Sequence, residues 1–72
     1  MMVTPTMSVT ERILDALDDD PRTRDEVIEV TTHQGVVTLT GQVKSEQIRR
    51  AAEEIARGQP GVVTLVNEIK VR

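Results

Sequence analysis

Apolar residues recur at helical spacing in two segments of the chain. The first segment follows Ser8, whose S-x-x-E sequence is a capping box that satisfies backbone amides at a helix start. Its apolar stripe predicts a helix over about residues 9–18. The second segment follows Ser45, a favourable N-cap residue, and closes at Arg57 and Gly58. Its apolar positions are spaced for one helix face: Ile48, Ala51, Ala52, Ile55 and Ala56.

Elsewhere the pattern alternates between apolar and polar residues, as it does in strands with one buried face. Such segments lie at about residues 27–32, 36–43 and 62–71. Gln34 and Gly35 fit a two-residue hairpin loop in which Gly35 supplies a positive φ. This loop predicts the following pairs: His33 with Val36, Thr32 with Val37, Val30 with Leu39, and Ile28 with Gly41. The glycine at the last position either leaves space for a helix or marks a bulge.

The order helix, strand, strand, helix, strand predicts an α+β domain. The second strand, the second helix and the third strand form a crossover, which is expected to be right-handed. Both helices should then cover one face of a three-stranded mixed sheet. We expect one domain over residues 8–72 and a disordered tail over residues 1–7.

The final strand is expected to contribute three residues to the core: Leu65, Ile69 and Val71. Strict alternation also directs Asn67 inward. Its amide then needs backbone partners, unless a bulge turns it outward.

The composition excludes several classes of site. The chain has 72 residues and neither cysteine nor aromatic residues, which excludes disulfides, thiolate metal sites and stacking platforms for bases. A net charge of −3, from 9 basic and 12 acidic residues, argues against nucleic-acid binding. There is no apolar run of transmembrane length and no secretory signal pattern. We expect a cytoplasmic protein from the chain as given. If it is cut from a longer exported protein, we expect a periplasmic or envelope location and a fused or neighbouring domain as a partner.

The hairpin and the final strand resemble those of the BON domain family. Residues 35–43, GVVTLTGQV, are close to the family's G-V-V-x-L-x-G-x-V, and residues 61–71 are similar to its closing G-V-x-x-V-x-N-x-L-x-V. Gln34 departs from the Asn or Asp that the family often has before the glycine. The resemblance covers about residues 9–72 and includes further apolar positions: Ile13, Leu17, Ile28, Val30, Ile48, Ala52, Ile55 and Ala56.

The resemblance implies a non-catalytic binding module. The family is associated with phospholipid or envelope binding and with protection from osmotic stress. A cytoplasmic relative binds potassium, so cation or small-ligand sensing is an alternative. The matching residues belong to the core and the turns, so the resemblance carries over a fold and no defined site.

The residues themselves give little support to an enzyme. His33 is the chain's single histidine and stands at a predicted hairpin tip without a serine or cysteine nucleophile beside it. Asp18, Asp19 and Asp20 lack the spacing of a calcium loop and are expected to form a solvated helix end. The glycines do not match a phosphate-binding loop. We therefore expect no catalytic, metal-binding or cofactor-binding residues.

Two surfaces are candidate binding sites. The first could meet phospholipid headgroups and consists of Arg22, Arg24, Lys44, Arg49 and Arg50. Glutamates are interleaved with the helical arginines, so a solvated face of internal ion pairs is the alternative.

The second surface is the sheet face that no helix covers, which is half polar and half apolar. It is a candidate for a protein partner or a homo-oligomer through Thr31, Val36, Thr38, Thr40 and Val66. A solvated face, which antiparallel sheets tolerate, is the alternative. Thr38→Lys is expected to disrupt such an interaction and to leave lipid binding unchanged.

Overall fold

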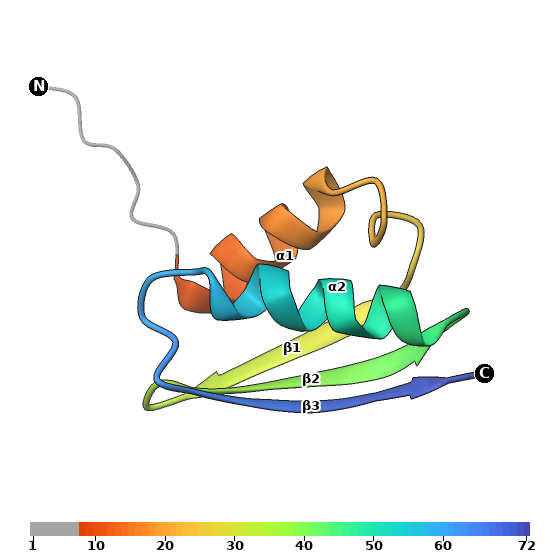
Figure 1. The fold of residues 1–72 in the computed structure, drawn as a ribbon. Helices are drawn as coiled ribbons and strands as arrows, with labels where there is room; N and C mark the ends of the chain where they lie inside the picture. The colour runs from red at the N-terminus through yellow and green to blue at the C-terminus, as the bar shows by residue number, and fades with distance from the viewer. Residues whose placement is uncertain (1–7) are drawn as a thin grey trace, which may run out of the picture.

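The computed structural model describes residues 8–72 and has the predicted order of elements. These are α1 (Val9–Asp19), β1 (Ile28–His33), β2 (Val36–Val43), α2 (Glu46–Arg57) and β3 (Thr64–Val71). Both helices lie on one side of the sheet, and the other side is uncovered by any described element (Figure 1). The predicted α+β class is confirmed. The expectation of a disordered tail over residues 1–7 lies outside the described residues.

Both helix starts have the caps that the sequence predicts. In α1 the amide of Glu11 donates to the Ser8 hydroxyl at 3.1 Å, and the Ser8 amide donates to the Glu11 carboxylate at 2.9 Å. In α2 the amide of Ile48 donates to the Ser45 hydroxyl at 3.2 Å. Because each bond satisfies an amide that has no partner inside the helix, these residues fix where the helices begin.

The strands form one sheet in the order β1-β2-β3. β1 and β2 are antiparallel, and their pairing agrees with the predicted register, including His33 with Val36 and Ile28 with Gly41. Gln34 and Gly35 have φ values of 51° and 84°, so both loop residues are left-handed, as a type I′ turn requires. β3 is parallel to β2, with Val43 opposite Val71.

The core lies between the helices and the sheet. The residues most completely buried there are Ile13, Val37, Leu39, Val43, Ala52 and Ala56. The small alanines let α2 approach the sheet closely. Leu65 is partly buried against this core and Ile69 is buried, as expected. Val71 is not: its exposed fraction is 43%, because it ends an edge strand and has a neighbouring strand on one side only.

Gly41 serves a different purpose from the two that the sequence indicates. It has a φ of 137°, and a Cβ added there would lie 2.6 Å from the carbonyl oxygen of Val27. The close neighbour is therefore the backbone leading into β1, and not a helix. A side chain at this position would force β1 and β2 apart.

Candidate functional site

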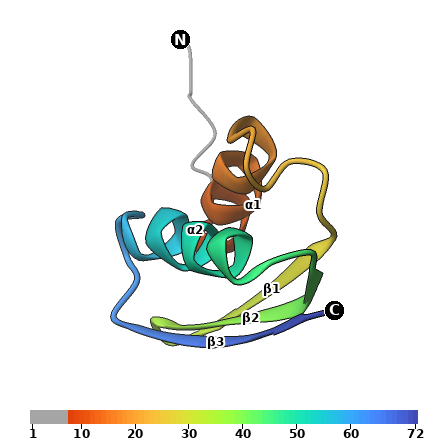
Figure 2. The same cartoon turned by 45° about the vertical axis from the view of Figure 1, so that its right-hand side comes forward.

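The parallel pairing of β2 and β3 brings basic residues to one end of the sheet. Lys44 directly follows Val43 at the end of β2, and Arg72 directly follows Val71 at the end of β3. The Arg72 amide donates to the Val43 carbonyl at 2.9 Å, which fixes the two strand ends side by side. Figure 2 shows the C-terminus beside the end of β2 and the start of β1.

The turn between α1 and β1 contributes to the same end. Thr23 is buried to 1% exposure, and its hydroxyl donates to the Leu17 carbonyl at 2.6 Å, so the turn is anchored from inside. Arg22 and Arg24 are left on the outside of this turn. A hollow of about 330 Å³ separates the turn from the start of α2 and is lined by Lys44 among others. We call Arg22, Arg24, Lys44, Lys70 and Arg72 the basic end.

Internal ion pairs neutralise part of the basic end. The Arg22 guanidinium lies 2.9 Å from the Asp20 carboxylate. This hydrogen-bonded pair lowers the pKa of Asp20 and raises the pKa of Arg22. The Arg72 guanidinium lies 3.7 Å from the Glu26 carboxylate, whose side chain is 4% exposed.

Other charges at the basic end remain available to a ligand. Among residues 8–72, no ion pair forms at Arg24, Lys44, Lys70 or Asp25, and all four are exposed. These four residues carry a net charge of +2, and the exposed Asp18, which lines a hollow together with Arg24, reduces the excess on that side of the turn. Val27 and Val71, with exposed fractions of 81% and 43%, lie at the same end. The combination of unpaired cations and exposed valines suits the interface between water and an anionic membrane.

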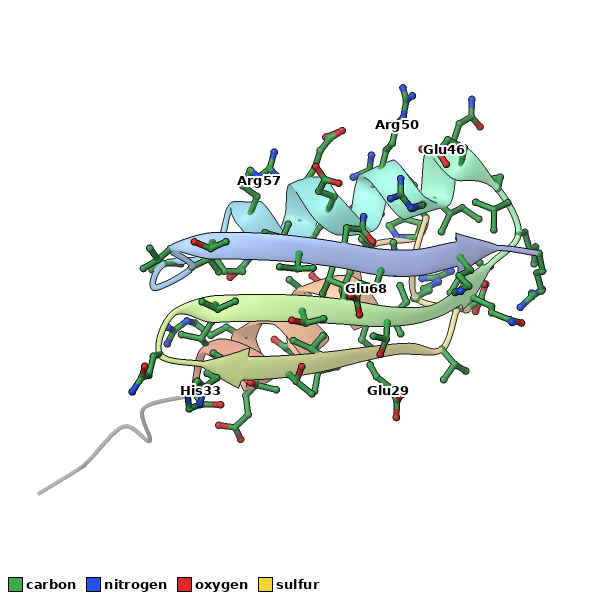
Figure 3. All side chains as sticks on the ribbon, turned by 90° about the horizontal axis from the view of Figure 1, so that it is seen from below. Glu29, His33, Glu46, Arg50, Arg57 and Glu68 are labelled. Carbon is green, nitrogen blue, oxygen red and sulfur yellow. The ribbon has the colours of Figure 1, made fainter. Side chains whose placement is uncertain are left out.

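Arg49 and Arg50 lie on α2, and both form contacts within the molecule. The Arg49 guanidinium donates to the Ile69 carbonyl at 3.0 Å and to the Asn67 carbonyl at 3.5 Å, and pairs with Glu46 at 3.1 Å. It therefore ties α2 to the outer edge of β3. Arg50 pairs with Glu46 at 3.3 Å on the exposed side of α2 (Figure 3).

The side-chain amide of Asn67 forms its hydrogen bonds where α2 contacts β3. Its side-chain NH₂ donates to the Arg49 carbonyl at 3.3 Å and to the Glu53 carboxylate at 3.2 Å. Its side-chain oxygen accepts from the Ile69 amide at 3.0 Å. Backbone partners, and not a bulge, thus explain a polar residue that alternation directs inward.

The uncovered sheet face brings the predicted interaction residues together. Thr38 lies between Thr31 and Val66, and the next row has Thr40 between Glu29 and Glu68. Val36 and Val66 have exposed fractions of 40% and 37%. The face therefore has a threonine and valine centre with a glutamate on each side.

His33 is exposed at the end of β1, beside the hairpin loop. Among residues 8–72, no group of three or more histidine, aspartate and glutamate side chains is placed to hold a metal ion. No helix in that range is long and apolar enough to span a bilayer.

The sequence interpretation missed Lys70 and Arg72 as members of the basic end. The signal for them is the parallel register of β2 and β3, which places Lys70 opposite Gln42 and brings Arg72 beside the end of β2. That register follows from packing between strands, and alternation within each strand does not reveal it.

Comparison with known proteins identifies the family. The model of the BON domain matches residues 7–72, nearly the whole chain, and a search of curated proteins finds no match. The matched range contains both helices, the hairpin and the final strand. The chain therefore belongs to the BON domain family.

Proposed function

We propose that the protein binds anionic phospholipid surfaces through the basic end and acts as a non-catalytic module. The observation that carries the proposal is a set of cations that form no ion pair among residues 8–72, Arg24, Lys44 and Lys70, beside the exposed Val27 and Val71. The family's association with phospholipid and envelope binding and with osmotic stress supports the same function.

The charge distribution favours one orientation on a membrane. The protein has a net charge of −3, and the exposed side of α2 and the uncovered sheet face both carry glutamates. The arginines and glutamates of α2 balance in number, so an anionic surface attracts the basic end more strongly than either of those regions. Cationic side chains contribute about 1 kcal/mol each near such a surface at physiological salt, so a few of them support weak, reversible binding.

Vesicle flotation tests this proposal. The wild-type protein is mixed with vesicles of neutral lipid alone or with added anionic lipid, at low and high salt. We expect flotation with anionic vesicles at low salt and its loss at high salt, because ions screen attraction to surface charge. Absence of binding to anionic vesicles at low salt would contradict the proposal.

A pair of matched variants then locates the surface. Lys44→Gln with Lys70→Gln removes two charges from the basic end, and Arg50→Gln with Arg57→Gln removes two charges from α2. The first pair should weaken the free energy of partitioning by about 2 kcal/mol, which lowers the partition coefficient roughly 30-fold. The second pair should have a much smaller effect. Equal losses would mean that net charge, and not this end, determines binding.

A further inference from the structure

The two edges of the sheet differ in their hydrogen bonding. On β3, the carbonyls of Asn67 and Ile69 accept from Arg49, and the Ile69 amide donates to the Asn67 side chain. These are three of the backbone groups that face outward in the middle of β3. Side chains therefore occupy the place that another strand would take along that edge.

The edge of β1 presents its backbone groups outward. In a two-residue type I′ hairpin the residues beside the loop, His33 and Val36, are a hydrogen-bonded pair, and hydrogen-bonded and non-hydrogen-bonded pairs alternate from there. Ile28, Val30 and Thr32 therefore direct their amides and carbonyls away from β2. Within residues 8–72 no side chain or loop bonds to these groups, and Figure 3 shows β1 as the outermost strand on its side.

We propose that a second copy of this chain pairs with β1, antiparallel, about a twofold axis at Thr31. Antiparallel pairing requires outward-facing residues to meet outward-facing residues, so the axis passes through a residue and not between two. With the axis at Thr31, Val30 of each copy pairs with Thr32 of the other. The resulting interface is isologous, since each copy contributes the same strand.

Charge complementarity selects this register from the alternatives. Glu29 and His33 lie on the same sheet face, two residues to either side of Thr31. An axis at Thr31 therefore places Glu29 of each copy opposite His33 of the other, twice. An axis at Glu29 or at His33 would place identical side chains together, and an axis at Val30 or Thr32 would leave both groups without a complementary partner.

The geometry suits these cross-strand pairs. Glu29 and His33 belong to the positions whose backbone groups face β2, so between the copies they form non-hydrogen-bonded pairs, in which side chains come closest. Imidazole donates an N–H to carboxylate whether it is neutral or protonated. Cross-strand pairs contribute about 0.2–1 kcal/mol each, so the two together change the dimer dissociation constant by about 2- to 30-fold.

Sedimentation equilibrium of the whole chain tests the dimer, with interference optics because the chain has no aromatic residue. We expect a reversible dimer as the concentration rises to about 1 mM, since a contact of one strand per copy is small. Glu29→Lys and His33→Glu should each raise the dimer dissociation constant by about 2- to 30-fold or more. The double variant, Glu29→Lys with His33→Glu, should restore it. A chain that stays monomeric throughout would overturn the proposal, and so would a double variant as weak as the single ones.

A backbone substitution provides a second test. Thr32→Pro removes an outward amide from an edge position, and Thr32→Ala keeps that amide while both lose the hydroxyl bond to Thr10 at 2.7 Å. The proline variant should be monomeric and the alanine variant dimeric, with circular dichroism confirming that both fold. If the proline variant does not fold, the double variant Glu29→Lys with His33→Glu decides whether the dimer forms through β1. Dimerisation that Thr38→Lys abolishes and the charge exchange leaves unchanged would assign the contact to the uncovered face and overturn the proposal.

Discussion

Replacing Arg49 by lysine tests whether this arginine stabilises the fold or binds a ligand. Arg49 makes bonds of 3.0 and 3.5 Å to carbonyls of β3 and an ion pair of 3.1 Å, and its side chain is 31% exposed. Lysine keeps the charge, but it cannot bond to both carbonyls and the carboxylate in the planar geometry of a guanidinium. Hydrogen bonds to charged groups contribute about 1.5–3 kcal/mol each when buried.

The expected loss is smaller than the sum of these bonds. The longer bond is at the limit of hydrogen-bonding distance, and water reaches the partly exposed guanidinium and replaces part of what is lost. We therefore expect Arg49→Lys to lower the free energy of unfolding by about 1–2 kcal/mol. A 72-residue chain has a total of about 4–11 kcal/mol, so this is a substantial fraction.

Arg50→Lys is the matched control. Arg50 lies on the same helix, bonds to the same glutamate and has a side chain that is 75% exposed. Exposed ion pairs of this kind contribute about 0–1 kcal/mol, so the control should change stability by less than about 0.5 kcal/mol.

Urea denaturation followed by far-ultraviolet circular dichroism measures both variants, and an unchanged slope confirms that the same surface unfolds. Equal stability of Arg49→Lys and wild type would refute the structural role. A loss of vesicle binding in Arg49→Gln, with stability unchanged, would return Arg49 to the headgroup-binding set.

Three further predictions follow from local geometry. Gly41→Ala should cost about 2–4 kcal/mol, since its positive φ and a carbonyl 2.6 Å from the new Cβ both oppose a side chain. Gly58→Ala, where φ is −78° and the nearest atom would be 3.5 Å away, should stay within about 0.5 kcal/mol; thermal melting compares the two. The pKa of Glu11 is lowered by hydrogen bonds with the backbone amide of Ser8 and, to a smaller extent, with its hydroxyl. These bonds therefore stabilise the fold fully at pH values above the unfolded-state pKa of Glu11, and the stabilisation is lost as the pH falls through the lower folded-state pKa. Glu11→Gln should therefore be less stable than wild type at neutral pH and nearer to it in acid, as urea midpoints at both pH values would show. Thr23→Val should cost about 1–3 kcal/mol in urea unfolding, because it leaves a buried carbonyl at the end of α1 without its 2.6 Å donor.

Local patterns predict most of this fold. Ser8 and Ser45 mark the helix starts, and the Gln34–Gly35 loop sets the register of β1 on β2, because a two-residue loop leaves one alignment that keeps apolar residues on one face. The error at Val71 has a clear cause. Alternation specifies which face a residue is on, whereas burial also depends on how far neighbouring elements extend over it.

The candidate site is less predictable because it depends on contacts between distant segments. In sequence, Arg49 and Arg50 are equivalent basic residues on one helix. In the structure, one turns toward β3 and the other toward solvent, as their side-chain exposures of 31% and 75% show. Lys70 and Arg72 join Lys44 only through the parallel register, which joins the ends of two strands separated by a whole helix.

The bonds of Arg49 and Asn67 along β3 have a consequence for how many copies can associate. A sheet with two accessible edges can add copies at both sides and grow without limit, as fibrils do. Here the middle of one edge is already bonded within the molecule, so the proposed edge pairing would use only β1 and would stop at two copies. Loss of either side chain would make the β3 edge accessible as well. Such a variant should form open-ended assemblies in concentrated solution while it is still folded.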